Sequence, residues 1–250
     1  MIKFFRRIRY DLVEKTPTSA KASAGAKTGK YLKYAIGEIL LVVIGILIAL
    51  SINNWNEKRL EKQTLNNIYT IIAEDLKNDI SEINHILKVK KEKEPIFNKI
   101  LDGLMTEVDY NNCNECEFLI VGNPNLTINK RGYNLLNNLS STNISTDSLT
   151  IKIAQFYTIL LIEITTDDDI RASDIANNVN DWKDNYNWYS DYITERNNNG
   201  FIEYALNNHD YTNRVANYYL NNYEIYIPKL KRFNTEAKVI LKQLEDKIKQ

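Results

Sequence analysis

The two cysteines, Cys113 and Cys116, have a CxxC spacing that could form a disulfide, bind a metal or support thiol redox chemistry. Outside the cytoplasm, two thiols this close oxidise to a small-loop disulfide. A redox site needs a thiolate stabilised by positive charge or by a helix N-terminus, whereas Glu115 and Glu117 place negative charge beside these cysteines. The motif therefore favours a structural disulfide, with free thiols and a metal or redox role as alternatives.

Other residues that could bind metals or act in catalysis are poorly placed for it. His85 and His209 are the only histidines, and a zinc site that includes them and the cysteines would draw on three distant segments. The carboxylates of residues 167–169 are adjacent in sequence, unlike the spaced ligands of a calcium loop, so we interpret them as a polar turn before a helix. We predict no catalytic residue, no metal, no cofactor and no enzymatic activity.

Tryptophan and tyrosine are abundant between residues 182 and 226. Both side chains offer amphipathic surface suited to partner contacts. Trp182, Tyr186 and Tyr189 match the apolar face of a helix, which predicts core packing. The residues that fall off this face, and are therefore candidate interface residues, are Trp188, Tyr192 and Tyr218. Core packing of the whole group is the favoured interpretation, and a binding face is the alternative.

An apolar segment determines where these groups lie relative to a membrane. The only ionisable residue in the interior of the segment 34–52 is Glu38. At about 1.5 Å per residue the segment matches a hydrocarbon core of about 30 Å. We predict a transmembrane helix over residues 34–54. The long basic segment before it and the length of the apolar stretch favour an uncleaved signal-anchor over a cleaved signal peptide.

Three residues of this helix are candidate transmembrane contacts. Gly45 and Ala49 form a small-xxx-small pair, which permits close approach of a second helix. Glu38 lies near the basic flank, where it can reach the headgroups or contact a partner helix. The pair predicts self-association through this helix as an alternative to an isolated anchor.

The charge distribution predicts the orientation. Residues 1–33 contain nine Lys or Arg against two Asp or Glu, although the whole chain has 32 of each kind. The positive-inside rule therefore predicts a basic cytoplasmic head and linker over 1–33, and an extracytoplasmic domain over 55–250. The head has the pattern of an amphipathic helix lying on the lipid bilayer, with a merely positive tail as the alternative. The acidic remainder gives no basic face for nucleic acid.

Downstream of the apolar segment, apolar residues recur at steps of three and four, which predicts amphipathic helices. Such helices are best buried together, so we expect an all-α fold: an N-terminal transmembrane helix followed by an antiparallel helical bundle. The first helix should end by Pro95, and the first and last helices should pair. The remaining expected elements are helices at 96–105, 131–140, 147–164, 175–193 and 219–248, a short strand at 118–121, and a kink or restart at Pro228.

The segments MIKFFRRIRYDL, KTGKYLKYAIGEILLVVIGILIAL and INNWNE resemble a family of uncharacterised single-pass membrane proteins of flavobacteria and their relatives, known as a domain of unknown function. The resemblance is specific over residues 1–12 and 27–57 and looser from Gly132 to Leu149, and Thr18–Ala26 departs from it. It implies a bacterial inner-membrane anchor with a periplasmic helical domain, and it implies no activity.

The sequence thus predicts a membrane-anchored periplasmic helical module that binds or scaffolds a protein partner. The alternative is a small-ligand-sensing bundle that acts through a partner membrane helix. A helical domain with aromatic surface and without a catalytic motif supports the first hypothesis, and the candidate transmembrane contacts support the second.

Overall fold

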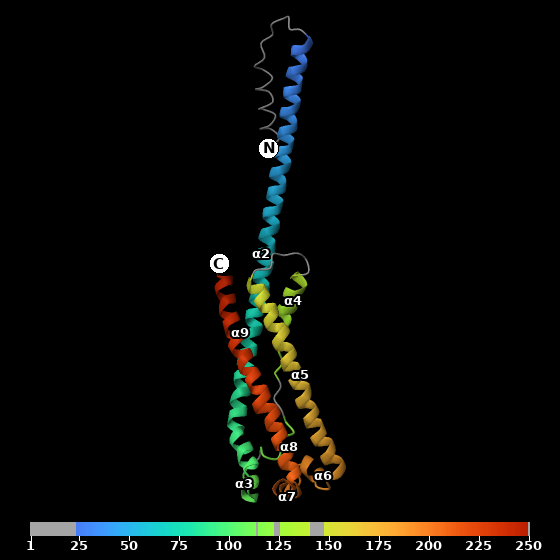
Figure 1. Cartoon of the computed structure of the whole chain (residues 1–250), viewed down its shortest axis with the longest axis vertical. Coiled ribbons are helices and arrows are strands. Elements are labelled where there is room, and N and C mark those ends of the chain that lie inside the picture. The colour runs from blue at the N-terminus through green and yellow to red at the C-terminus, as the bar shows by residue number, and fades with distance from the viewer. Residues whose placement is uncertain (1–23, 114, 123–125, 141–147, 250) are drawn as a thin grey trace. The chain divides into compact units, whose positions relative to one another are not determined.

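The computed structural model describes residues 24–113, 115–122, 126–140 and 148–249, which form helices and turns with no strand among them (Figure 1). The chain divides into two compact units, Met1–Leu60 and Glu61–Gln250. Helix α2 (Ala24–Leu101) belongs to both units. The all-α fold predicted from the apolar periodicity is therefore confirmed.

In the first unit, α2 carries large apolar side chains on all sides between Ile36 and Ile52. The large apolar side chains from Ile36 to Ile52 are each 44–64% exposed. A helix this long and this apolar, with no face buried, has the character of a membrane anchor. Helix α5 (Ser148–Asn185) is also long and apolar enough to cross a bilayer, but Ile153, Phe156 and Leu160 bury one of its faces in the second unit. We therefore treat α5 as a core helix.

In the second unit, α2 pairs with α9 (Ile227–Ile248), the last helix. Lys77 forms an ion pair with Glu245 at 2.8 Å, and Asn234 donates a hydrogen bond to Asn84 at 2.9 Å. Residue numbers rise along α2 as they fall along α9, so the two helices are antiparallel. The expected pairing of the first and last helices is confirmed.

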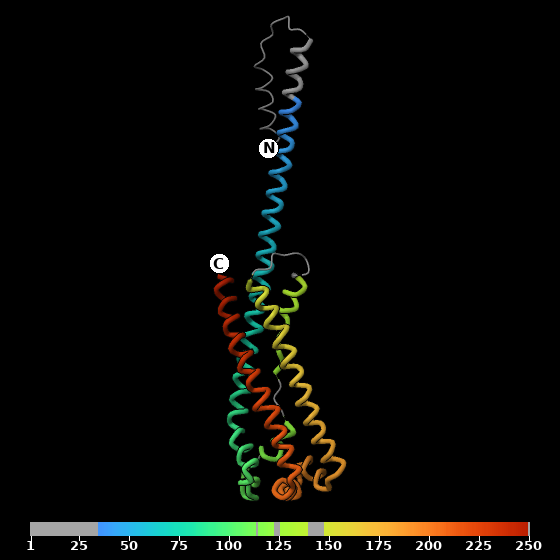
Figure 2. The backbone as a smooth tube through the Cα atoms, in the orientation of Figure 1, coloured from blue at the N-terminus to red at the C-terminus, as the bar shows by residue number. Residues whose placement is uncertain are grey.

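Helices α5 and α4 (Arg131–Ser140) complete this bundle (Figure 2). Lys152 and Asp167 of α5 bind Gln243 and Lys229 of α9, which makes these two helices antiparallel as well. Tyr133 of α4 stacks on a tyrosine of α5. Helix α4 therefore packs against α5.

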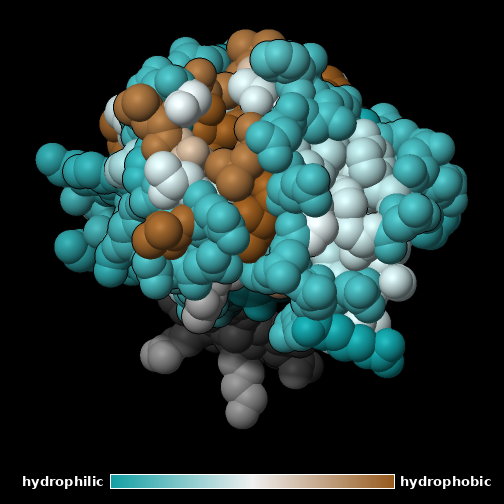
Figure 3. All heavy atoms as spheres, turned by 90° about the horizontal axis from the view of Figure 1, so that it is seen from below, coloured by the Kyte–Doolittle hydropathy of each residue, from teal (hydrophilic) through white to brown (hydrophobic). Residues whose placement is uncertain are grey.

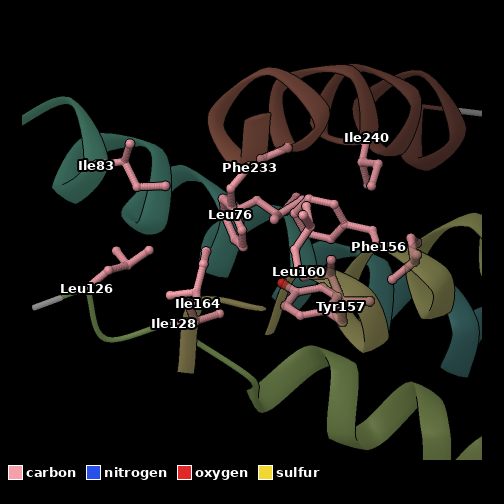
Figure 4. Close-up of a cluster of buried hydrophobic side chains, with 14 of the residues drawn as sticks. Leu76, Ile83, Leu126, Ile128, Phe156, Tyr157, Leu160, Ile164, Phe233 and Ile240 are labelled. Carbon is pink, nitrogen blue, oxygen red and sulfur yellow. The ribbon is translucent and has the colours of Figure 1, made fainter. Parts of the chain in front are cut away.

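The bundle has two hydrophobic cores. The first joins α2, α4, α5 and α9 through aliphatic residues and a few aromatic rings, including Leu76, Phe156, Leu160 and Phe233 (Figure 4). The second is mainly aromatic and joins the end of α2 to a set of shorter elements. These elements are α3 (Glu107–Asn111), α6 (Tyr189–Ile193), α7 (Asn199–Asn207), α8 (His209–Tyr219) and the π-helix η1 (Leu220–Tyr226).

The prediction that the first helix ends by Pro95 is wrong, because α2 continues to Leu101. Phe97 and the residues after it bury the last turns in the aromatic core. The hydroxyl of Tyr223 donates a 3.0 Å hydrogen bond to the carbonyl oxygen of Lys90, one turn before the proline. Tertiary contacts thus stabilise a helix that a proline would otherwise interrupt.

The separate helix expected at 96–105 is therefore the end of α2. Gly103 has a φ of 68°, and the amide of Leu104 donates to the carbonyl of Lys99 at 2.9 Å. A left-handed glycine with this hydrogen bond is the usual C-terminal cap of a helix. Leu104 consequently lies outside the helix whose apolar face it was predicted to share.

Three further expectations, about a strand, two helices and Pro228, need correction. Residues 118–121 form turns, not a strand. The helices expected at 147–164 and 175–193 are joined, because α5 runs without interruption to Asn185 and includes the aspartates predicted as a turn. Pro228 lies in the first turn of α9, which follows η1 directly with helical backbone at the junction, so the structure has a change from π-helix to α-helix there and no restart. The expected first residue of the helix over 147–164 lies outside the described residues.

Candidate partner-binding surface

One end of the second unit is built from the C-terminal end of α2 together with α3, α6 and α7 (Figure 1). We call it the distal end, because it is remote from Glu61, where α2 enters this unit. The predicted disulfide, the aromatic cluster and an exposed apolar patch all lie here.

A disulfide joins Cys113 to Cys116 in a turn after α3. Cys116 is buried in the aromatic core. The residue after it, Glu117, accepts a 2.8 Å hydrogen bond on its carbonyl oxygen from the hydroxyl of Tyr192, and its carboxylate accepts another from Asn198. The disulfide therefore stabilises a turn that anchors α6 and the start of α7.

Helix α3 is short but firmly held. The Thr106 hydroxyl accepts a 3.2 Å hydrogen bond from the amide of Asp109, whose carboxylate accepts one at 2.9 Å from the amide of Thr106. This reciprocal pair is a capping box. Lys99 of α2 donates to the same carboxylate at 2.6 Å, and this bond, with those from Thr106, lowers the pKa of Asp109 to about 2. The orientation of α3 on α2 is thereby fixed.

The aromatic core supports the distal end from within. Trp182 Nε1 donates a 3.1 Å hydrogen bond to the hydroxyl of Tyr204, which donates to Asp210 at 2.6 Å. Arg214 binds the carboxylates of Asp210 and Asp181. Burial, followed by the bond to Asp210, raises the pKa of Tyr204 above its ordinary value. These bonds connect α5, α7 and α8.

The candidate interface residues Trp188, Tyr192 and Tyr218 do not form an exposed surface. Tyr192 and Tyr218 are buried in the aromatic core, and Trp188 is half-buried against it. The prediction assumed that the helical periodicity continues past residue 185, but α5 ends there and the chain turns into α6. Gly200 packs so closely on Trp188 that a Cβ atom at that glycine would lie 2.5 Å from the Trp188 Cβ atom.

The surface that the structure does expose at the distal end is aliphatic. Leu104 is 62% exposed, Val108 66% and Leu206, on α7, 36%. Helix α7 packs against α3, since the rings of Tyr110 and Phe201 meet edge to face at 6.3 Å. Viewed toward the distal end, hydrophobic residues gather over α3 and α7 (Figure 3). We define Leu104, Val108 and Leu206 as the distal patch.

Acidic side chains border the distal patch. Asp102, Glu107 and Glu203 are all exposed, and Glu203 lies one helical turn before Leu206. The neighbouring cation Lys99 is already bound to Asp109. The patch therefore combines an apolar centre with a negatively charged border.

This patch was not predicted, because residues 96–105 were expected to form one helix that includes Leu104. Gly103 followed by a Thr-x-x-Asp capping pattern at residues 106–109 is the local signal that could have revealed it, since it predicts a helix end and a new helix start.

The remaining candidate residues are not part of the distal patch. Glu38, Gly45 and Ala49 are exposed on the first-unit part of α2, and at about 100° per residue they share one face of it. His85 and His209 are exposed on different helices. Among the described residues, no group of histidine, cysteine and carboxylate side chains could hold a metal ion.

A family described as "Family of unknown function (DUF6090)" matches residues 38–223 of this chain, which is more than half of its length. No curated protein and no solved structure matches this chain.

Proposed function

The chain belongs to the DUF6090 family of unknown function, and we propose from its own residues that it is a membrane-tethered, non-enzymatic module that binds a protein partner through the distal patch. The observation that carries this proposal is the exposure of Leu104 and Val108 on elements that hydrogen bonds hold rigidly. Exposed aliphatic patches with a polar border are typical of protein interfaces.

The tether is α2. Its apolar part suggests a membrane anchor, and the basic head before it supports a cytoplasmic N-terminus with the second unit in the bacterial periplasm. The disulfide is consistent with this address, because disulfides persist in oxidising compartments. The resemblance to flavobacterial single-pass proteins supports the inner membrane.

Thiol labelling tests this orientation. Cys113 is half-buried. After mild reduction of cells with a permeabilised outer membrane, a membrane-impermeant maleimide should label it. The double variant Cys113→Ser, Cys116→Ser should give no signal and serves as the control. Labelling that appears only after lysis of the inner membrane would reverse the proposed orientation.

The acidic border specifies the chemistry of the partner. We expect a protein segment that presents an apolar side chain flanked by Lys or Arg, because opposite charges around an apolar centre speed association and disfavour other partners. Such binding weakens as the salt concentration rises, since exposed charges are screened over about 10 Å at 0.1 M.

The substitution test uses two variants of the full-length protein. Leu104→Asp with Val108→Asp should reduce capture of a cross-linked partner about 30-fold, because truncating an interface centre costs about 2 kcal/mol or more. Ile162→Asp is the matched control, since Ile162 is 63% exposed on the outer face of α5. Equal loss in both variants, or no loss in the first, would contradict the proposal.

The second candidate function is a sensing bundle that acts through a partner membrane helix or by self-association. It rests on the shared exposed face of Glu38, Gly45 and Ala49. If cross-linking recovers only copies of this chain, and Gly45→Leu abolishes that product while the distal variant does not, the second candidate replaces the first.

A further inference from the structure

Charged and polar side chains form a buried layer between the two cores. On α2, Lys90 lies between the residues of the aliphatic core and those of the aromatic core, and Arg171 has the same position on α5. Asn222 of η1 lies beside them, and Lys90 is only 2% exposed. A lysine is almost never buried this fully without specific partners.

Two partners of the Lys90 amino group are acceptors whose orientation is fixed. Its Nζ donates to Asn222 Oδ1 at 2.7 Å and to the hydroxyl oxygen of Tyr218 at 3.1 Å. Tyr218 donates its own proton to the carbonyl of Gly122 at 2.9 Å. Asn222 Nδ2 donates to the backbone carbonyl of Tyr218 at 3.0 Å. Both oxygens therefore face Lys90 with lone pairs, and the amino group must be the donor.

The π-helical form of η1 brings these groups together. Its i→i+5 hydrogen bonds widen the turn, so residues four and five positions after Tyr218 both lie near it. Asn222 binds the Lys90 amino group, and Tyr223 donates to the Lys90 carbonyl oxygen at 3.0 Å. The Nζ atom also lies 5.0 Å from the ring centroid of Tyr218 and 5.8 Å from that of Tyr223. One lysine thus links α2 to the end of α8 and to two residues of η1.

Charged neighbours oppose a proton on Lys90. The main one on α5 is the guanidinium of Arg171. It contacts, among other groups, the Asp168 carboxylate at 2.8 Å and the Tyr226 ring at 3.4 Å. The charges that act on Lys90 are those of Arg171 on α5 and Lys93 on α2, and the titratable groups in contact with its amino group are Tyr218 on α8 and Tyr223 on η1. Around these groups, Asp168 binds Arg171, Asp174 acts on Tyr218 and Glu94 acts on Tyr223. Lys93 itself pairs with Glu115 at 3.0 Å.

We propose that Lys90 is a proton-sensitive latch, which holds η1 against α2 when it is neutral and favours the release of η1 when it is protonated. In the closed state the amine keeps both hydrogen bonds without bringing a second charge next to Arg171. In the open state the ammonium reaches water. This proposal concerns the interior of the bundle and does not depend on the distal patch.

The direction of the pH effect follows from the environment of the lysine. Burial, and then the charges of Arg171 and Lys93, lower the pKa of Lys90 from 10.5 to about 7. An exposed lysine in the open state keeps the ordinary value, so between these two values the open state binds more protons. Closing therefore becomes more favourable as the pH rises from about 7 toward 10.5, and acidification weakens the latch.

Hydrogen exchange of the full-length protein in mild detergent tests the latch. After correction for intrinsic exchange rates, protection of the amides of α8 and η1 should rise about 100-fold between about pH 6 and pH 9. In Lys90→Met, which keeps the length of the side chain without a titrating group, the same amides should change by less than about 3-fold. An equal rise in both proteins would overturn the proposal.

A second variant keeps the test decisive if Lys90→Met does not fold. Asn222→Asp places a carboxylate at 2.7 Å from the amino group, which raises the pKa of Lys90 by charge attraction. The rise in protection should then move to higher pH by at least about one pH unit. A profile that superimposes on that of the unmodified protein would show that Lys90 does not control the opening of η1.

Discussion

Gly132→Ala should destabilise the second unit more than a Gly→Ala substitution at any other described glycine. A Cβ atom at Gly132 would lie 2.4 Å from Ile72 Cγ1, 2.7 Å from the Ile72 nitrogen and 2.9 Å from its Cα atom. Two of these atoms belong to the backbone of α2, so no side-chain rotation relieves the clash. The amide of Gly132 also donates to Asp75 at 2.9 Å, which holds α4 at this short distance.

We expect this substitution to cost about 3 kcal/mol, the upper part of the range for overpacked sites. For a unit of this size, that lowers the melting temperature by roughly 6–12 °C. Thermal unfolding of the full-length protein in mild detergent, followed by tryptophan fluorescence, measures the change. Gly122→Ala is the control, because its nearest contact would be 3.6 Å away and its effect should stay within about 0.5 kcal/mol. Equal melting temperatures for the two variants would contradict the close packing of α4 on α2.

Asp79→Asn should stabilise the protein at neutral pH. The Asp79 side chain is fully buried, and its Oδ1 atom accepts hydrogen bonds from the amide and the side chain of Asn129, at 3.1 and 2.6 Å. Its Oδ2 atom has no partner among the described residues. Burial, only partly opposed by the bonds from Asn129, raises the pKa of Asp79 to about 6.

The sign of the effect follows from the proton balance. Between the ordinary value of 3.8 and about 6, the folded state binds the proton more tightly than the unfolded state. Stability therefore falls as the pH rises through this window, and above it the folded protein carries the full penalty of a buried carboxylate. A pKa shift of this size corresponds to about 3 kcal/mol in the free energy of unfolding.

Asparagine keeps the acceptor for Asn129 and removes the charge. At about pH 7, Asp79→Asn should raise the melting temperature by roughly 6–12 °C, and the pH dependence between about 4 and 6 should become flatter. Asp75→Asn, one turn earlier on α2, is the matched control. It should lower the stability, because Asp75 binds Arg131 at 2.7 Å and its charge is compensated. A loss of stability in both variants would show that Asp79 is not under electrostatic penalty.

The all-α fold class could be predicted from the sequence, because apolar residues recur at helical spacing along both long core helices. The same pattern predicted the pairing of α2 and α9, since the longest apolar faces need the longest partners. Gly132, in the part of the chain with the looser family resemblance, could not be interpreted before its contact with Ile72 was visible. Its role depends on a distance between helices, which local spacing does not contain.

The errors also have a common physical origin in tertiary contacts. The aspartates at 167 and 168 looked like a turn, but Lys229 binds the first at 2.6 Å and Arg171 binds the second at 2.8 Å. With their charges compensated, they remain inside α5. Trp188 and Tyr192 were predicted to face outward because the helix register was extended beyond its end at Asn185. Partners from distant segments decided each of these cases.

Site-specific photo-cross-linking tests the central claim most directly. A photoreactive side chain replaces Val108 in one full-length protein and Ile162 in another, two positions that are 66% and 63% exposed. After irradiation of living cells, we predict one dominant protein product from position 108, none from position 162, and weaker cross-linking at high salt. A product from position 162 alone, or the same products from both positions, would contradict a partner-binding role for the distal patch.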